Sequence, residues 1–443
     1  MNKTLLAASL SLLAVPLLAL TANNAHAENL LQVYQQAKNH DAQLQAQESG
    51  HLATLEQRQQ ALAGFRPQVN LSGNASYAAE RDSLTSKTVD GNQANYALTL
   101  DQPLYNQGVK ANIAKTDALV RQSAATLDAV RQNLIVRVAT AYFETLQAQD
   151  NLTFAKAEKA AINRQLVQAK AYFEAGRSAI TDVKEAEASD ATAQAQEIAA
   201  TQQLDIAREQ LRVLTGSVYP SLDVPRTNMP LAMPTPNSID AWVNIAKQNN
   251  HQLRASQQAM AAAQKGVAVQ RANKLPTVNL FAKQTGSYLN NDTYINQRSN
   301  DVAVGISVSM PLYTGGATTS KIREAQFTFQ QTQQSYNLQA SQTEQQVRSA
   351  FLSIQSSMSQ VIANQQALAS AETATQATQA GFEVGTRTAV DVLNAVRAEF
   401  RSRRDHSRAR YDFLLNTLLL RQAAGTLTEK DVMAVSTMMQ AQN

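Results

Sequence analysis

The chain contains two closely matched stretches, Pro67-Gln-Val-Asn-Leu71 and Pro276-Thr-Val-Asn-Leu280. Each proline follows a segment rich in Ala, Gln and Leu. Those residues form helices well, whereas proline ends a helix because it lacks a backbone donor. From the next residue onward, apolar and polar residues alternate. Since successive side chains of a strand point to opposite faces, we expect the chain to change from helix to strand at both prolines.

Four strands of about ten residues are predicted, in two pairs that lie within 67–105 and 276–313. Their one-sided apolarity suits the lipid-facing wall of a transmembrane β-barrel. A soluble antiparallel hairpin alternates in the same way, so the strands alone leave both possibilities open. The polar segments 78–94 and 286–300 are predicted to be loops. The apolar positions are Val69, Leu71, Ala75, Tyr77, Tyr96, Leu98, Leu100, Val278, Leu280, Ala282, Val302, Val304, Ile306, Val308 and Met310.

The two proline stretches belong to a duplication that extends along the chain, with matched residues at an offset of 208 to 209 positions. We therefore predict two structural repeats, 28–216 and 237–425, each with a helix, a strand pair, a long helix and a further helix. Between them, residues 217–236 hold five of the ten prolines and predict an extended linker. Residues 426–443 form a C-terminal tail. Matched pairs include Pro103 and Pro311, Phe173 and Phe382, Asp182 and Asp391, and Gly216 and Gly425.

After each strand pair the chain runs without proline, over 106–175 and again over about 317–380. As a helix, the first of these segments would be roughly 105 Å long, far beyond the size of a globular domain. Gly176 and Gly385 are predicted to reverse the chain into a shorter helix. Residues that recur every seven positions along the first segment predict coiled-coil packing: Ile113, Val120, Leu127, Leu134, Ala141, Ala148, Ala155 and Ile162.

Residues 1–27 have the pattern of a secretory signal peptide. Lys3 gives a positive start, residues 5–20 are almost wholly apolar, and Ala25-His26-Ala27 forms a cleavage motif. The mature chain is expected to begin at Glu28. No later stretch is apolar enough to cross a membrane as a helix. Such an exported chain is periplasmic, secreted, or placed in the outer membrane as a β-barrel.

The composition of the 443 residues argues against several functions. The 39 Lys and Arg residues barely exceed the 35 Asp and Glu residues, so a nucleic-acid partner is not expected. There is no cysteine, which removes disulfides and thiolate chemistry. The five histidines are scattered, and motifs for a phosphate loop or a serine nucleophile are missing. We therefore expect no enzyme activity, no metal and no cofactor.

Geometry connects these elements to a possible function. If the strands lie at one end of a helix of roughly 100 Å, the reversals at Gly176 and Gly385 lie at the other end. A pore extended by a helical tube fits this arrangement. Because the smallest closed barrels have about eight strands, several chains must contribute strands. Two chains would supply eight strands and three would supply twelve, and the pattern does not choose between them.

The sequence resembles the TolC family of outer-membrane efflux channels over essentially the whole mature chain. The most specific stretch is Gly381-Phe-Glu-Val-Gly-Thr-Arg-Thr-Ala-Val-Asp-Val-Leu393. Further stretches that carry the resemblance are 27–37, 275–280, 310–316 and 424–431.

This resemblance implies an α+β membrane protein, in which a long α-helical coiled-coil barrel continues as a transmembrane β-barrel. Each protomer would supply four strands to a homotrimer. The barrel would lie in the outer-membrane lipid and the helices in the periplasm. The implied partners are a periplasmic adaptor (membrane-fusion) protein and an inner-membrane transporter, in a tripartite efflux or type I secretion system. The implied cargo is drugs, toxic small molecules or proteins.

A gate is expected near the second reversal. Asp391 lies within two turns of Gly385, so a symmetric oligomer would carry a ring of these carboxylates. The alternative is that Asp391 only caps a helix or serves as a first-turn acid. The resemblance places Asp391 at the first of two entrance aspartates. At the second position this chain has Asn394, which halves the expected negative charge.

The resemblance also implies links that keep the gate closed. Arg387 corresponds to Ser178 in the first half and would bond across to Thr181 and Asp182. Phe382 stands where the family has an aromatic hydroxyl, so one link would be lost. Alternatively, Arg387 is simply exposed on a turn, where an ion pair contributes at most about 1 kcal/mol. The adaptor would dock on the reversals, at Gly176, Val384, Gly385 and Thr386.

A competing hypothesis is a periplasmic coiled-coil adaptor or scaffold that never enters a membrane. Long Ala/Gln helices suit such a protein equally well. The strand pairs at duplicated positions and the extended family resemblance favour the channel.

Overall fold

The computed structural model describes residues 27–81, 88–226, 228–291 and 295–441. Nearly all of the predicted signal peptide lies outside these residues. The first half contains α1 (Leu30–His40), α2 (Ala42–Ala63), β1 (Gln68–Arg81), β2 (Thr88–Tyr105), α3 (Gln107–Glu174) and α4 (Ile180–Thr215). After β3 (Val224–Pro225), the second half contains α5 (Ile239–Asn249), α6 (His251–Ala272), β4 (Thr277–Asn291), β5 (Gln297–Ser309), α7 (Ala317–Glu383) and α8 (Ala389–Ala423). The chain closes with α9 (Glu429–Thr437) and β6 (Met439–Gln440).

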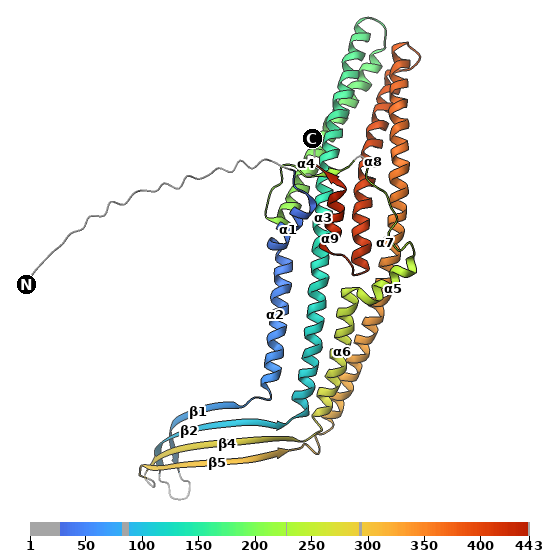
Figure 1. The fold of residues 1–443 in the computed structure, drawn as a ribbon. Helices are drawn as coiled ribbons and strands as arrows, with labels where there is room; N and C mark the ends of the chain where they lie inside the picture. Colours follow the sequence, from blue (N-terminus) through green and yellow to red (C-terminus); the bar gives the residue numbers. More distant parts are fainter. Residues whose placement is uncertain (1–26, 82–87, 227, 292–294, 442–443) are drawn as a thin grey trace, which may run out of the picture.

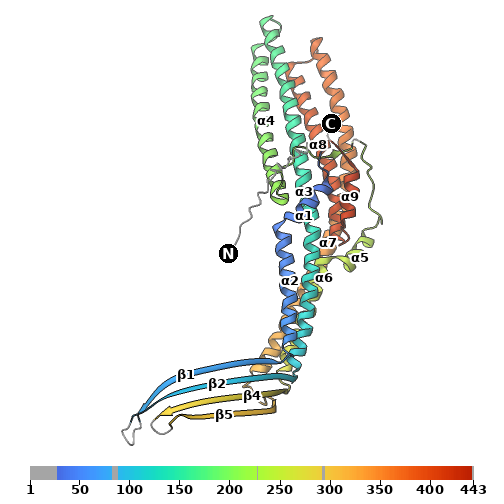
Figure 2. The same cartoon turned by 60° about the vertical axis from the view of Figure 1, so that its left-hand side comes forward.

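Four strands form one antiparallel sheet at the foot of the long helices, in the order β1-β2-β4-β5 (Figures 1 and 2). Leu71 lies opposite Leu98, and Leu280 lies opposite Ile306. Because paired residues share a face of a sheet, the predicted apolar positions gather on one side. That side is open, since the side chain of Leu71 is 75% exposed and that of Val302 is 74% exposed.

The strands are longer than the sequence predicted. Segments 78–94 and 286–300 were expected to be loops, yet the pairing continues through Ala78 with Gly91 and through Tyr288 with Arg298. Residues 82–87 and 292–294 lie outside the described residues. In the described parts the prediction of loops was wrong, because the regular alternation of apolar and polar residues ends there while the strands continue. Their backbone hydrogen bonds persist where the alternation of apolar residues, on which the prediction rested, has ended.

The long helices match their predicted positions. The helix α3 has 68 residues and covers the predicted segment 106–175 to within one residue at each end. The helix α7 has 67 residues. Each folds back on a shorter helix, so that α3 with α4 and α7 with α8 form two antiparallel pairs, which lie side by side (Figure 1). Six of the eight predicted heptad positions along α3 are buried, including Leu134, Ala141 and Ile162, whereas Ile113 and Val120 are half-buried.

The helices α2 and α6 pack along α3 and α7 on the side toward the sheet. Near the middle of the long helices lies a group of short elements that we name the equatorial belt: α1, α5, α9, β3, β6 and the linker between the halves (Figure 1). The strand β3 pairs with β6, which anchors the C-terminal tail. The largest apolar core lies here and joins the belt to α3 and α8. Inside it, the fully buried Tyr142 hydroxyl lies 3.0 Å from the carbonyl oxygen of Glu28 and 2.9 Å from that of Asp223.

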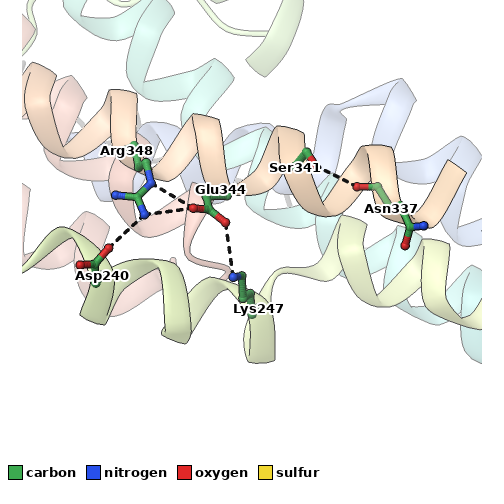
Figure 3. A network of polar contacts seen from close by, with 6 residues as sticks. All are labelled: Asp240, Lys247, Asn337, Ser341, Glu344 and Arg348. Carbon is green, nitrogen blue, oxygen red and sulfur yellow. Dashed lines mark hydrogen bonds and ion pairs between the residues drawn. The ribbon is translucent and has the colours of Figure 1, made fainter. Parts of the chain in front are cut away.

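The belt is attached to α7 by a surface network of charges, shown in Figure 3. The Arg348 guanidinium lies 3.0 Å from carboxylate oxygens of Glu344 and of Asp240 in α5. The Lys247 ammonium lies 3.3 Å from Glu344. Hydrogen bonds from Arg348 and Lys247 lower the pKa of the Glu344 carboxyl.

Candidate gate at the helical tips

Both helix pairs end in a tight reversal at the end of the molecule opposite to the sheet (Figure 1). Gly176 and Gly385 adopt left-handed backbone conformations, with φ of +70° and +81°. A Cβ added at either position would meet nothing within 4 Å. Glycine is therefore favoured here by the backbone conformation and not by lack of space, as expected where a helix ends in a left-handed residue.

Asp391 belongs to a capping box at the start of α8. Its carboxylate accepts hydrogen bonds from the Thr388 N–H and from the Thr388 hydroxyl, both at 2.9 Å. The Asp391 N–H in turn donates to the Thr388 hydroxyl oxygen at 3.2 Å. These bonds, helped by the charge of Arg387, lower the pKa of the Asp391 carboxyl. The predicted first-turn role is confirmed, whereas the pore-ring role remains a prediction.

Asn394 is exposed, three residues further along α8. The apolar neighbours between them, Val392 and Leu393, are buried against α3 and α4. The helix therefore turns its polar side away from the other helices of the protomer. Such a side is available to line a pore.

Arg387 is exposed at the second reversal, and its N–H donates to the Gly381 carbonyl at 3.2 Å. A Cβ at Gly381 would lie 2.8 Å from the Arg387 Cγ, so glycine makes room for this side chain. Within the described residues of one protomer, Arg387 forms no ion pair with Asp182 and no hydrogen bond with Thr181. Contacts to a neighbouring protomer lie beyond a single chain, and the closed-state links remain a prediction.

Phe382 has a packing role that the sequence did not predict. Its ring lies 5.6 Å from the ring of Tyr172 on α3, centroid to centroid, and the Arg177 guanidinium lies 4.7 Å from the Tyr172 ring centroid. Phe382 also packs against an apolar cluster that includes Ile162 and Val392. The two tips are therefore joined by aromatic contact. One feature of the sequence could have indicated Tyr172, since it is an aromatic residue four positions before the turn at Gly176.

The predicted docking positions are accessible. Val384 is 76% exposed, and Gly176, Gly385 and Thr386 are exposed as well. The Thr386 hydroxyl donates to the Gly381 carbonyl at 3.0 Å, which fixes the outer face of the second tip. Each tip therefore presents a small exposed surface.

Sequence reasoning missed polar ties between the two helix pairs. The Arg404 guanidinium of α8 lies 2.8 Å from the carboxylate of Glu158 on α3, and the Glu158 side chain is only 3% exposed. Closer to the belt, Asp150 on α3 accepts hydrogen bonds from Ser407 and Tyr411 of α8. No sequence pattern relates residues that are 246 or more positions apart.

In the part of the chain that the structure describes, no group of three or more His, Asp or Glu side chains is placed to hold a metal ion. Nor does any helix there have the length and apolarity needed to cross a membrane.

Long paired helices joined to a sheet with an exposed apolar face are typical of one class of protein, the ducts of the outer membrane. The profile of the family "Outer membrane efflux protein" matches this chain twice, at residues 33–217 and 242–426. The chain therefore belongs to the outer membrane efflux protein family.

Individual relatives agree with this assignment. The chain is 38% identical to outer membrane protein TolC of Vibrio cholerae over 413 residues, which are 93% of each chain. It is 33% identical to TolC of Escherichia coli, over 93% of this chain and 85% of that one. Among solved structures, CusC superposes with a TM-score of 0.78 at 19% identity, over 90% of this chain and 92% of that chain.

The predictions of the family, the fold class, the function and the location in the outer membrane are thus confirmed. The protein has the TolC-like fold, with long coiled-coil helices continued by a four-stranded segment of a transmembrane barrel. It is an efflux duct of the outer membrane, with its helical domain in the periplasm. The competing hypothesis of a periplasmic adaptor is set aside.

Proposed function

We propose that three copies of this chain form one gated exit duct, which serves a tripartite efflux or type I secretion system. The observation that carries the proposal is a single sheet with an exposed apolar face, at the foot of helices about 100 Å long. The sheet suits the outer-membrane lipid, and the helices would extend from it into the periplasm.

The edges of the sheet support assembly. In the described part of the chain, β1 and β5 each pair with a strand on one side only. Long edge strands with open hydrogen-bonding groups need a partner, and inside a membrane closure is required. Four strands per protomer are too few to close, whereas three protomers give the twelve strands that the family resemblance implies.

The two halves are proposed to be structural repeats, 28–216 and 237–425. Their elements follow the same order, and corresponding helices have 11 and 11, 22 and 22, 68 and 67, and 36 and 35 residues. Residues 217–236 then act as the linker and 426–443 as the tail, and both contribute to the belt. Three protomers would place six such repeats around the duct.

The gate is proposed to lie at the second tip. In a trimer, Asp391 and Asn394 would form adjacent rings, with a charge only on the first. Arg387 would contact Asp182 and Thr181 across the boundary between helix pairs and hold the closed state. Phe382 would support it by packing, in place of the missing hydroxyl bond.

The partners are proposed to be a periplasmic adaptor that docks on Gly176, Val384, Gly385 and Thr386, and an inner-membrane transporter that supplies the cargo. Relatives bear names from both kinds of system, such as the proteases secretion protein PrtF of Dickeya chrysanthemi and the outer membrane efflux protein BepC of Brucella suis. Cargo of either kind, drugs and toxic small molecules or proteins, suits a wide passive duct.

A direct test is to separate membranes and to run the protein on gels with and without boiling. We expect the protein in the outer-membrane fraction, at three times the mass of one chain before boiling and at the single-chain mass afterwards. A soluble periplasmic protein, or a dimer, would contradict the proposal.

A further inference from the structure

The buried ion pair between Glu158 and Arg404 joins the two helix pairs of the protomer. Glu158 lies on α3, in the pair with α4, and Arg404 lies on α8, in the pair with α7. The two charges are 2.8 Å apart, and the Glu158 side chain is 3% exposed while that of Arg404 is 30% exposed. A carboxylate in such a site needs its partner, because water cannot replace the lost charge.

The position of this pair along the helices is informative. Arg404 lies about 23 Å along α8 from the start of that helix at Ala389. Between it and the tips, no other ion pair joins the two helix pairs in the part of the chain that the structure describes. In the same described region, the only hydrogen bond between side chains that joins the two helix pairs is that of Gln165 with Gln379, at 3.0 Å between neutral amides. On the belt side, Asp150 binds Ser407 and Tyr411, so the helices are held firmly.

We infer that Glu158 and Arg404 are positioning residues of the gate. Their ion pair is the contact between charged groups nearest the tips that holds the two helix pairs together, and we call the parts of the helix pairs between this contact and the tips their arms. When the duct opens, the α7–α8 arm moves away from the α3–α4 arm. The inference rests on the proposed gating of the duct. The arms beyond the pair are held by the aromatic contact of Tyr172 with Phe382 and by apolar packing, which tolerate sliding better than a buried charge pair does.

The neighbouring residue supplies a matched control. Lys159, next to Glu158, forms an ion pair of 2.8 Å with Glu197 on α4, within one helix pair. Substitution of Lys159 by Gln removes an ion pair at the same height but leaves the two helix pairs tied. A general loss of stability would appear in both variants, whereas a positioning role would appear only in Glu158→Gln.

The first readout is the open fraction of single channels in planar bilayers. We expect Glu158→Gln and Arg404→Gln each to raise it at least about tenfold, given the usual cost of breaking a buried pair. The double variant should not exceed the larger single effect, because both changes remove the same contact. Lys159→Gln should match the unmodified protein.

The second readout is the distance between the two tips, measured by pulsed electron paramagnetic resonance. The chain has no cysteine, so Ala175→Cys and Val384→Cys would carry the only spin labels, with one labelled protomer per trimer. We expect Glu158→Gln to lengthen and broaden this distance and Lys159→Gln to leave it unchanged. If Glu158→Gln does not assemble, Arg404→Gln answers the same question, because it removes the other partner of the same ion pair.

Two failures are distinguishable. If the unmodified protein forms no channel, the proposed function is wrong. If it conducts, and Glu158→Gln and Lys159→Gln give the same open fraction and the same tip distance, the ion pair is only structural and the inference is overturned.

Discussion

Asp391 caps the start of a helix at the tip where the gate is proposed. Its hydrogen bonds with Thr388 start α8, and the same carboxylate lies at the mouth proposed for the duct. The capping box could be predicted from sequence because its two residues are three positions apart. The contact of Phe382 with Tyr172 could not, because it joins helices from different halves of the chain.

The capping box gives the second tip a dependence on pH. The pKa of the Asp391 carboxyl is lowered in the folded protein. The ionised carboxylate therefore stabilises the tip fully at pH values above the ordinary pKa of 3.8, and this stabilisation is lost as the pH falls below 3.8. A spin label at Thr386→Cys should therefore become more mobile on acidification below 3.8. With Asp391→Ala added, which removes the accepting oxygens, the label should be mobile at all pH values. Equal mobility of the two proteins at neutral pH would argue against the cap.

Gly385 offers a second test at this scale. A tryptophan there must adopt a positive φ, at a cost of about 1 to 2 kcal/mol, and would cover the docking surface. We expect Gly385→Trp to abolish efflux of a toxic dye from cells while trimers still form. Gly50→Leu, where an added Cβ meets nothing, is the control and should keep efflux. Loss of trimers in Gly385→Trp would make Gly385 a folding residue instead.

At the scale of elements, the strands show where sequence patterns stop being informative. The alternation predicted the apolar parts of all four strands, and the structure places those residues on one face. It did not predict the outer parts of the strands, where the regular alternation ends but backbone pairing continues. The long helices were easier to predict because a heptad repeat persists over many turns.

The two faces of β5 provide matched positions. Ile306 lies on the apolar face and Ser307, the next residue, on the opposite face. An arginine on the lipid side of a barrel costs about 2 to 4 kcal/mol near the middle of the bilayer. Ile306→Arg should therefore sharply reduce the amount of heat-resistant trimer in outer membranes, while Ser307→Arg should be tolerated. Equal yields would contradict the assignment of the lipid face.

At the scale of the whole molecule, the belt holds the two helix pairs around a shared core. Its composition could not be predicted from sequence, because β6 of the tail pairs with β3 more than two hundred residues earlier. The linker was predicted to be extended from its prolines, but its partner was not. Short segments of this kind are placed by tertiary contacts and carry little pattern of their own.

The tail offers a pair of neighbouring positions that differ in burial. Val432 of α9 is 1% exposed and belongs to the large core, whereas Met433 is 53% exposed. An unpaired carboxylate at a buried site costs about 3 kcal/mol or more. Val432→Asp should lower the thermal stability of the helical domain, measured by circular dichroism, and Met433→Asp should change it little. Similar melting of both variants would mean that α9 is not part of the core.

The gated duct itself is tested most directly by single-channel conductance of the purified protein in planar bilayers, with Arg387→Ser measured beside the unmodified chain. We predict a small, steady conductance for the unmodified protein, because the closed links leave a narrow mouth, and a clearly larger one for Arg387→Ser. An open pore that the substitution leaves unchanged would contradict a gate at Arg387. Failure of the folded protein to insert would contradict the duct.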